Sequence, residues 1–440
     1  HHIMFAIIYS LNNLFATGSN NVGKLGMHES NQKILTFTKL PEFTKKALHR
    51  VHQGEHHAFV TDVDGKLYGW GDNTCKKLSF DNSILVVNSP KVVPFFSKIK
   101  VKYADGGSDH SVVLTQDGQI YTMGSNSNNQ LGRDAPTCSG PGLVDSSKLA
   151  KDEVFTSVHT HGITNYALTN QNNIYVWGYC GDGIITSYCG PNTNEVRFPV
   201  PTKMQIPHLV KKIHVGKFSF YYETTTGEIY GLGNNQEGQL CQPVSDAVKN
   251  PVLIGGVANV IDIQSSNDHT VFLDASGRAY GCGSADKGEF GNNFEVKRLE
   301  RLTPISEGLG KVLDVATTEQ GTYLLTEHGL FSAGKEEVGE LSYNDVHKLT
   351  KKTFERVVMD IANLNTIVAH YNFAFLVGTV PQAPGMSGGA IAGIVIGVLA
   401  GLTVVGFGAW FFLKKCKGKP RNRYAGIEEG NKLVFNDDQW

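Results

Sequence analysis

A short apolar run that ends in glycine recurs at nearly equal intervals along most of this chain of 440 residues. The intervals between successive copies are 53, 53, 54, 55, 50 and 51 residues. The seven copies end at Gly18, Gly71, Gly124, Gly178, Gly233, Gly283 and Gly334. So narrow a spread indicates one structural unit copied without an inserted domain.

Each copy has the pattern of a small antiparallel sheet. A second apolar run and a turn precede the glycine in stretches such as HAFVTDVDGKLYGWG, and the Asp64-Gly65 pair there supplies the positive φ that a tight hairpin needs. Further β-branched runs lie upstream, as at 99–104, 260–264, 312–316 and 357–362. Proline-flanked runs such as 251–254 lie downstream, and proline suits an edge strand. Four strands in each unit predict one blade of a β-propeller.

The two ends of the repeat region predict how the propeller closes. The first copy supplies a final strand at 14–17, and the last segment supplies runs at 357–362 and 366–377 without a recognisable hairpin turn. Joining these ends makes one composite blade beside six continuous ones, and closure removes two open sheet edges. The expected fold class is all-β, a seven-bladed propeller over 14–378 closed between its N- and C-terminal strands. An extra hairpin at either end would make eight blades.

Sequence motifs around the glycines resemble those of a known repeat family. Runs at 125–132, 234–240 and 284–291 have the pattern of Gly-Gln-Leu-Gly, and Gly107-Ser-Asp-His110 and Ser266-Asn-Asp-His269 precede two hairpins. Together they resemble the regulator of chromosome condensation repeat. The resemblance covers about 14–378 and implies a seven-bladed propeller closed between its termini. It also implies either nucleotide exchange on a small GTPase, as in the founding member, or simple protein binding, as in many relatives.

The fourth repeat departs most from this pattern. The stretch after Gly178 lacks the Gly-Gln-Leu-Gly ending, so this loop is where we expect a feature particular to this protein. Cys180 and Cys189 within it form a disulfide if the domain is secreted, or remain two separate thiols. Seven Cys in the whole chain are too sparse for a disulfide scaffold.

No chemical motif in the sequence indicates an enzyme or a cofactor. His57, His110 and His269 occupy the same place in different repeats, so we expect each to tie its own blade together rather than to bind a metal. The Gly-x-Gly pairs close strands and precede no helix, so they are not phosphate loops. The tail 414–440, with seven basic and four acidic residues, carries +3 of the total charge of -1. Residues 1–413 therefore carry -4, which suits nucleic acid poorly.

A stretch without charge near the end of the chain predicts a transmembrane helix. Residues 390–413 are 24 in number and contain no Lys, Arg, Asp or Glu, which is long enough to cross about 30 Å of hydrocarbon. Basic residues follow at once, so the tail 414–440 is expected in the cytoplasm and the propeller outside or in a lumen. The predicted organisation is a segment 1–13, the propeller 14–378, a Pro/Gly linker 379–389, the membrane helix and the tail.

Small residues and short motifs add hypotheses about this C-terminal region. Gly389, Gly393, Gly397 and Gly401 recur every four residues, so they form one helix face on which a second copy can pack closely. Cys416 is a candidate for palmitoylation, although an unmodified thiol is the alternative. The Tyr424 to Ile427 stretch resembles a Tyr-x-x-apolar sorting signal.

Two functional hypotheses follow. In the first, a single-pass protein of the plasma membrane or an endomembrane presents the propeller as a non-enzymatic binding or adhesion module for a protein partner. In the second, a tail anchor holds the propeller in the cytoplasm as an exchange factor or scaffold for a small GTPase. The lack of a recognisable leader and of any Asn-x-Ser/Thr site favours the second placement.

Overall fold

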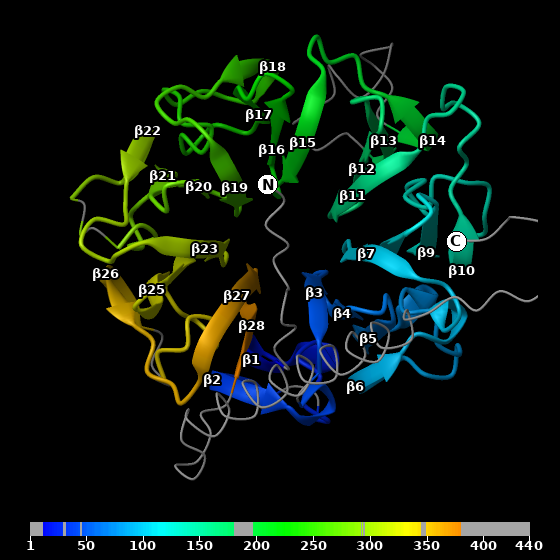
Figure 1. The fold of residues 1–440 in the computed structure, drawn as a ribbon, viewed down its shortest axis with the longest axis horizontal. Helices are drawn as coiled ribbons and strands as arrows, with labels where there is room; N and C mark the ends of the chain where they lie inside the picture. The colour runs from blue at the N-terminus through cyan, green and yellow to red at the C-terminus, as the bar shows by residue number, and fades with distance from the viewer. Residues whose placement is uncertain are drawn as a thin grey trace, which may run out of the picture. The chain divides into compact units, whose positions relative to one another are not determined.

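Short runs rich in β-branched and aromatic residues, separated by glycine-containing turns, form seven four-stranded antiparallel sheets in the part of the chain that the structure describes. The structure is a computed structural model that describes residues 12–29, 32–44, 46–179, 197–291, 293, 295–344 and 349–379. Each sheet is one blade, and the blades follow one another around a ring (Figure 1). The seven-bladed all-β propeller predicted from the repeat is therefore confirmed.

The composite blade, blade 1, contains strands from both ends of the repeat region. Its order is β2-β1-β28-β27, and β1 pairs with β28 from Asn13↔Gly378 to Gly18↔Phe373. Its strands are β1 (Asn13–Ser19), β2 (Lys33–Leu40), β27 (Ala362–His370) and β28 (Phe373–Thr379). The N-terminal and C-terminal strands thus close the ring, as expected.

Blades 2 to 7 are continuous in sequence, and the first strand of each lies innermost (Figure 1). Blades 2 and 3 hold β3 (Leu48–Gln53), β4 (His57–Asp62), β5 (Leu67–Asp72), β6 (Val86–Val92), β7 (Val101–Gly106), β8 (His110–Thr115), β9 (Ile120–Ser125) and β10 (Cys138–Leu143). Blades 4 and 5 hold β11 (Phe155–His161), β12 (Thr164–Thr169), β13 (Ile174–Tyr179), β14 (Arg197–Lys203), β15 (Val210–Val215), β16 (Ser219–Thr224), β17 (Ile229–Gly233) and β18 (Val248–Leu253). Blades 6 and 7 hold β19 (Val260–Ser265), β20 (His269–Asp274), β21 (Ala279–Ser284), β22 (Arg298–Pro304), β23 (Val312–Thr317), β24 (Gly321–Thr326), β25 (Gly329–Lys335) and β26 (Thr350–Arg356). Four 3-10 turns, η1 (Asn21–Gly23), η2 (Pro41–Phe43), η3 (Thr74–Lys76) and η4 (Pro94–Phe96), interrupt the loops.

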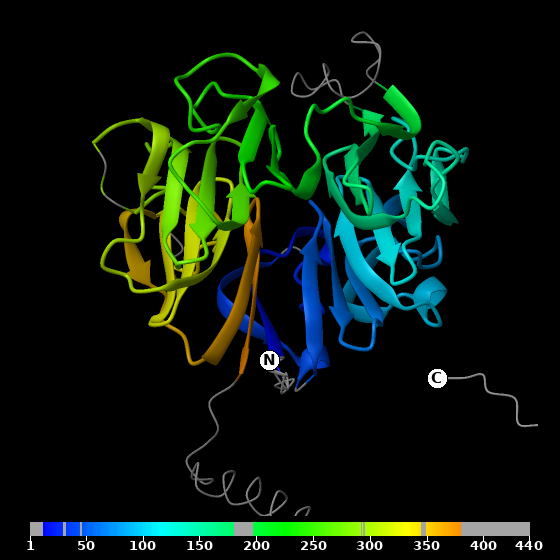
Figure 2. The same ribbon diagram turned by 45° about the horizontal axis from the view of Figure 1, so that its top comes forward.

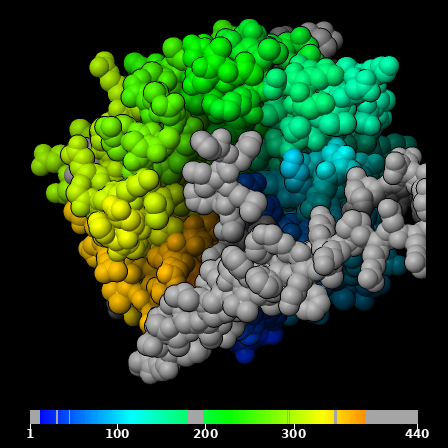
Figure 3. Space-filling model, in the orientation of Figure 1, coloured from blue at the N-terminus to red at the C-terminus, as the bar shows by residue number. Residues whose placement is uncertain are grey.

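The hydrophobic core lies between neighbouring blades. Trp70 of blade 2 is fully buried, packs edge-on against Phe375 of blade 1 at 5.6 Å between ring centroids, and donates its indole N–H to the Lys24 carbonyl. Tyr221 of blade 5 packs in the same way against Phe272 of blade 6 at 5.7 Å. Side chains of one repeat thus bury those of the next, so a single repeat has little core of its own. Figure 3 shows neighbouring blades in contact from the cyan through the green and yellow to the orange part of the ring.

The seven repeat glycines share one backbone conformation. Their φ values lie between +97° and +120°, a region that a residue with a Cβ rarely adopts. Each marks a shift in the pairing of the third and fourth strands, for example between Gly69 and Gly71. At Gly71 a Cβ would lie 2.6 Å from the His56 carbonyl oxygen. The repeated motif is therefore a β-bulge that brings two backbones too close for any side chain.

One predicted strand of blade 1 is wrong. Residues 357–361 form a loop in which Val358 is 90% exposed, and the inner strand β27 begins at Ala362. A tight turn at Tyr371 and Asn372, with Tyr371 at a φ of +46°, then joins β27 to β28, whereas we expected one run at 366–377 without a hairpin turn. Neighbouring turns hold Tyr371, since the Glu319 backbone N–H donates to its carbonyl at 2.8 Å and its hydroxyl donates to Glu55 at 2.9 Å.

Two disulfides join neighbouring blades and were not expected from the low number of cysteines. Cys75 in the loop after β5 pairs with Cys138 on β10, and Cys241 in the loop after β17 pairs with Cys282 on β21. The first joins blades 2 and 3, and the second joins blades 5 and 6. The predicted Cys180–Cys189 pair lies outside the described residues.

We expect the two disulfides to differ sharply in their access to a reductant. Cys138 is exposed, whereas Cys241 and Cys282 are 7% and 0% exposed. Dithiothreitol on the folded protein should therefore reduce Cys75–Cys138 and spare Cys241–Cys282, because a thiolate must reach the sulfur that it attacks. Iodoacetamide labelling followed by peptide mass spectrometry measures the reduction of each disulfide. Urea-unfolded protein is the control in which all four cysteines should react. Equal labelling of the two pairs in the folded protein would contradict the expectation.

Among the described residues, no helix is both long and apolar enough to cross a membrane. The predicted span 390–413 lies outside them, and so do the predicted helix face with Gly389, Cys416 and the Tyr424 motif. These remain predictions of the sequence.

Candidate functional site

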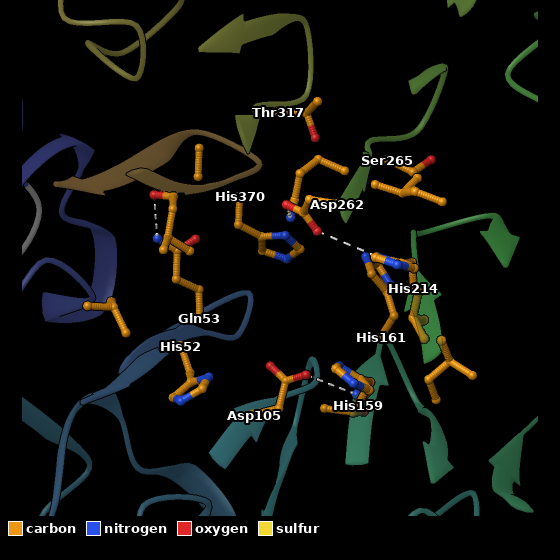
Figure 4. A pocket seen from close by; sticks show the side chains of 18 of the residues that line it. His52, Gln53, Asp105, His159, His161, His214, Asp262, Ser265, Thr317 and His370 are labelled. Carbon is orange, nitrogen blue, oxygen red and sulfur yellow. Dashed lines mark hydrogen bonds and ion pairs between the residues drawn. The ribbon is translucent and has the colours of Figure 1, made fainter. Parts of the chain in front are cut away.

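The seven inner strands line a central channel with a volume of about 820 Å³. Figure 4 shows that polar side chains from several blades meet there, and those labelled include His52, Asp105, His159, His214 and His370. We call this cavity the channel. Its volume exceeds those of two other cavities among the described residues, of about 310 and 550 Å³.

The strand register explains why polar side chains form this lining. His52 pairs with Phe59, Asp105 with Val112, His159 with Tyr166 and His214 with Tyr221, so these four residues occupy the same position of four inner strands. Blades 1 and 7 place Val368 and Ala316 at the equivalent position. At this position the channel wall is thus polar along blades 2 to 6, where blade 6 holds Gln264, and apolar at blades 7 and 1.

Burial keeps the histidines of this wall neutral. It lowers the pKa of His159 to about 3 and that of His214 to about 3, with smaller effects from nearby charged groups. The pKa of His52 also lies well below its usual value, again mainly because of burial. His159 Nδ1 lies 3.1 Å from the Tyr103 hydroxyl, and His214 Nδ1 lies 3.6 Å from an Asp262 oxygen. These histidines are therefore uncharged hydrogen-bonding groups at neutral pH.

The pKa values of two carboxyl groups in the channel are raised, whereas those of the histidines are lowered. Burial raises the pKa of Asp105 to about 7, although the backbone N–H groups of Thr160 and Gly106 donate to it. Burial likewise raises the pKa of Asp314 to about 6, although Thr366 and the Ile367 backbone N–H donate to its Oδ2. Both carboxyl groups are therefore partly protonated near neutral pH.

The lining has the composition of a polar cavity. No group of three or more His, Cys, Asp or Glu side chains in the described residues could hold a metal ion. The Nε2 atom of His52 and the Oε1 atom of Gln53 are buried without a hydrogen-bond partner among those residues. They can pair with polar groups that enter the channel.

The three repeat histidines lie in blade interfaces. His57 Nε2 is 2.7 Å from Ser111 Oγ of blade 3, His110 Nε2 is 2.7 Å from Asn165 Oδ1 of blade 4, and His269 Nε2 is 3.2 Å from Thr322 Oγ1 of blade 7. Each of these hydrogen bonds joins a blade to the next one, whereas we expected bonds within a blade. The reason is that the side chain at the start of each second strand points across the interface. His269 also makes a bond of the expected kind, between its Nδ1 and Ser266 Oγ of its own blade at 2.7 Å.

The His57–Ser111 pair resembles a base and a nucleophile but is closed to substrate. Both side chains are fully buried, and Ser111 Oγ donates its proton to the Lys77 carbonyl at 2.7 Å. A catalytic serine must instead be accessible and must donate to its base. This pair therefore holds blades together.

Lys77 is a buried residue that we did not single out from the sequence. It is fully buried, and its Nζ lies 2.7 Å from Asp72 of its own blade and 3.0 Å from Asp109 of blade 3. Burial acts to raise the pKa of Asp72, but hydrogen bonds from Lys77 and Thr74 outweigh it and the pKa lies below its usual value. Lys77 occupies the Gln position of the Gly-Gln-Leu-Gly motif, and this substitution was the available signal.

One end of the channel is surrounded by the turns that join the first and second strands of the blades. We call this ring the mouth, and its seven turns are residues 54–57, 107–110, 161–164, 216–219, 266–269, 318–321 and 370–373. The chain leaves β28 at Thr379, which pairs with Ala362 at the opposite end of the strands (Figure 2). The mouth and this exit are thus on opposite faces of the propeller.

The third residue of each turn differs from blade to blade. In order from blade 2 to blade 1, this position holds His56, Asp109, Ile163, Phe218, Asp268, Gln320 and Asn372. Only the turns of blades 4 and 5 are apolar there, and a second cavity of about 310 Å³ lies between them. The signal in the sequence is an apolar residue at this turn position in two consecutive repeats, where the other repeats have a polar or charged residue.

Comparison with known proteins supports the resemblance seen in the sequence. One family model of the regulator of chromosome condensation (RCC1) repeat matches residues 64–114 and 226–273, and another matches 101–130 and 260–289. The chain therefore carries RCC1 repeats.

The relatives share the repeats but differ in length. E3 ubiquitin-protein ligase HERC2 of Homo sapiens is 23% identical over 342 residues, which are 74% of this chain and 7% of that protein. The regulator of chromosome condensation of Mus musculus is 30% identical over 197 residues, which are 44% of this chain and 43% of that protein. The chain thus matches less than half the length of either relative.

Solved structures agree with the fold. The crystal structure of Prp20p from Saccharomyces cerevisiae, described together with its binding to Gsp1p and histones, superposes with a TM-score of 0.73 at 18% identity. The match covers 85% of this chain and 92% of Prp20p. Human WBSCR16 superposes with a TM-score of 0.70 at 18% identity, over 84% of this chain and 100% of that one. At such identities the likeness concerns the fold alone.

Proposed function

From a seven-bladed propeller that carries RCC1 repeats, we propose that the protein is a non-enzymatic binding module whose partner protein contacts the mouth of the channel. The observation that supports this most is the variation in the third turn residue, which is charged, polar or apolar in different blades while the strands that hold it keep one register. Variable side chains on turns of a rigid scaffold are the usual basis of protein recognition.

The test is site-specific photocrosslinking in cells that express the full chain. Benzoylphenylalanine replaces Glu319, an exposed residue of the mouth, or Gln171, an exposed residue of a turn on the opposite face. We expect a discrete crosslinked partner from position 319 and none from position 171. A partner that crosslinks only from position 171, or from neither position, would refute the proposal.

We also propose that residues 390–413 anchor the protein in a membrane, with the propeller in an oxidising compartment and residues 414–440 in the cytoplasm. The uncharged run followed by basic residues supports the anchor. The two disulfides between blades support the compartment, since cytosolic proteins seldom keep disulfides. Protease added to intact cells should then remove the propeller. Survival of the propeller in cells whose surface proteins are digested, with no luminal pool, would contradict this placement.

A cytoplasmic exchange factor or scaffold for a small GTPase is the second candidate function. It is supported by the match to the mouse regulator of chromosome condensation and by the fold shared with Prp20p, whose structure is described together with Gsp1p binding. The test is release of a fluorescent GDP analogue from a panel of purified small GTPases. The first proposal predicts no acceleration by the propeller, and catalytic acceleration by substoichiometric propeller would establish the second.

A further inference from the structure

We propose that the cavity between Ile163 and Phe218 is an anchor pocket for one large aromatic side chain of the bound protein, next to a carboxylate of the same peptide. We call it the Ile163–Phe218 pocket. The proposal rests on the proposed function and specifies which turns of the mouth recognise an aromatic and acidic part of the partner. It assigns the recognition to blades 4 and 5, where the turns depart from the rest of the ring.

One part of the pocket wall is apolar and aromatic, and the rest is polar. Ile163 and Phe218 are half-buried, and Tyr166 and Tyr179 complete the lining from blade 4. Tyr166 is 6% exposed and packs against Phe220 at 4.9 Å between ring centroids, so the wall that it forms is held in place. In other blades the position of Ile163 and Phe218 holds a charged or polar residue, such as Asp109, which would disfavour an apolar guest.

Glycine opens the space between the two turns. No atom lies within 4 Å of the place where a Cβ of Gly162 would stand. The pocket has a volume of about 310 Å³, at the lower end of the range for ligand pockets. A volume of this size suits one aromatic residue rather than a whole small domain, and single aromatic anchors commonly dominate protein interfaces.

The charge beside the pocket selects an acidic neighbour. Lys217 Nζ lies 4.6 Å from the ring centre of Tyr371 and 5.2 Å from that of Phe218, and no carboxylate of the described residues forms an ion pair with it. The other charged residue of the lining, Glu55, accepts a hydrogen bond from the Tyr371 hydroxyl at 2.9 Å. A peptide carboxylate next to the anchor would therefore meet a cation held over aromatic rings.

The remaining groups near the pocket do not reverse this preference. Burial lowers the pKa of His161 to about 4, so this histidine adds no positive charge at neutral pH. Three acidic residues of the mouth, Asp109, Asp268 and Glu319, belong to the turns of blades 3, 6 and 7, and Asn267 donates to Glu319 at 3.0 Å. Glu55 lines the pocket itself, where the Tyr371 hydroxyl donates to it. The apolar pair and Lys217 thus coincide at one side of the mouth, and Glu55 is the one acidic residue in the pocket lining.

Two capped peptides test the pocket directly on the full chain. The first peptide is glycyl-tryptophyl-aspartyl-glycine and the second carries lysine in place of aspartate. Titrations followed by saturation-transfer NMR are expected to show saturable, millimolar binding of the aspartate peptide and binding of the lysine peptide that is about tenfold weaker, from the charge difference. Absence of saturable binding of the aspartate peptide would overturn the proposal.

Variants of the two turns locate the binding. Phe218→Asp should abolish binding of the aspartate peptide, and Lys217→Glu should reverse the preference between the two peptides. The matched controls are Gln320→Asp and Glu319→Lys, which make the same kinds of change at the equivalent positions of blade 7 and should leave both titrations unaltered. Unfolding curves by circular dichroism check that every variant is folded. Unchanged binding in a folded Phe218→Asp variant would overturn the pocket.

Photocrosslinking from position 319 separates the two proposals. If wild-type protein crosslinks its partner and Phe218→Asp does not, the pocket contributes to recognition of that partner. If both crosslink it equally, the pocket proposal fails and the proposed function stands. If neither does, the proposed function fails, and the peptide titration still decides whether the pocket accepts an aromatic acidic peptide.

Discussion

Acidification from pH 7 to pH 5 is expected to unfold the propeller. The cause is a set of eight buried histidines whose pKa values lie below the ordinary value of 6.5, mainly because burial disfavours the charged ring. They are His52, His57, His110, His159, His161, His214, His269 and His370. An unfolded chain binds protons at these rings below pH 6.5, whereas the folded chain does not until the pH is much lower.

The direction of the pH dependence follows from this difference. The free energy of unfolding is at its full value above pH 6.5 and falls as the pH drops toward the folded pKa values, which are about 3 to 4 for His110, His159, His161, His214 and His269. At pH 5 each such ring costs about 2 kcal/mol, against a total stability of roughly 5 to 15 kcal/mol for a folded domain. The combined cost is therefore comparable with that total.

The buried carboxyl groups act in the opposite direction but are fewer. The pKa values of Asp105, Asp314 and Glu336 are raised, mainly by burial, to about 7, 6 and 7. Each stabilises the fold at low pH and loses that contribution as the pH rises from about 4 to its folded pKa. Burial also raises the pKa values of Asp268, Glu289 and Glu340, and together these groups offset part of the loss from the eight histidines.

Tryptophan fluorescence and circular dichroism across a pH titration measure the transition. His214→Gln should move the acid midpoint to lower pH, because it removes one ring that must take up a proton on unfolding. The matched control is His328→Gln, on a turn where the side chain is 66% exposed, and it should leave the midpoint unchanged. A native signal retained down to pH 4 would contradict the expectation.

Gly71→Ala is expected to lower the free energy of unfolding more than Gly227→Ala does. Gly71 has a φ of +102°, and its Cβ would lie 2.6 Å from the His56 carbonyl oxygen and 2.7 Å from the His57 Cα. Both contacts are with backbone, so neither can be relieved by rotating a side chain. The strain in φ and the overpacking together should lower the free energy of unfolding by roughly 2 to 5 kcal/mol.

Gly227→Ala separates the two contributions. Gly227 also has a positive φ, of +89°, but no atom lies within 4 Å of its Cβ position. The free energy of unfolding of this variant should therefore fall only by the contribution of the strained φ, about 1 to 2 kcal/mol. Urea unfolding of the two variants and the wild type measures the difference. Equal decreases in the free energy of unfolding would mean that the close approach of the two backbones at the bulge adds nothing to the cost of the methyl group.

The sequence was most informative where a structural requirement is local. Gly65 and Gly71 adopt positive φ because of the turn and the bulge in which each lies, so their spacing along the chain revealed the blade and its number of copies. The same reasoning failed at Tyr371, which adopts a positive φ without being glycine. There hydrogen bonds with the turns of neighbouring blades, rather than the residue type, hold the turn.

The sequence was least informative about contacts between repeats. Ser111 is 54 residues from His57, and Cys282 is 41 residues from Cys241, so no short motif contains both partners. The repeat histidines were recognisable as equivalent to one another, yet the blade to which each bonds depends on how the sheets pack. The same holds for Lys77, whose carboxylate partners come from two blades.

The sequence by itself determined the seven-fold repeat, the strands and most of the turns, because backbone conformation at glycine and the alternation of apolar residues are properties of neighbouring residues. Only the tertiary structure decided which side chains share a site. His52, Asp105, His159 and His214 come from four repeats, and they meet because closure of the ring brings their strands to one axis. Ile163 and Phe218 lie side by side for the same reason, since a pocket between two blades exists only after the blades have packed.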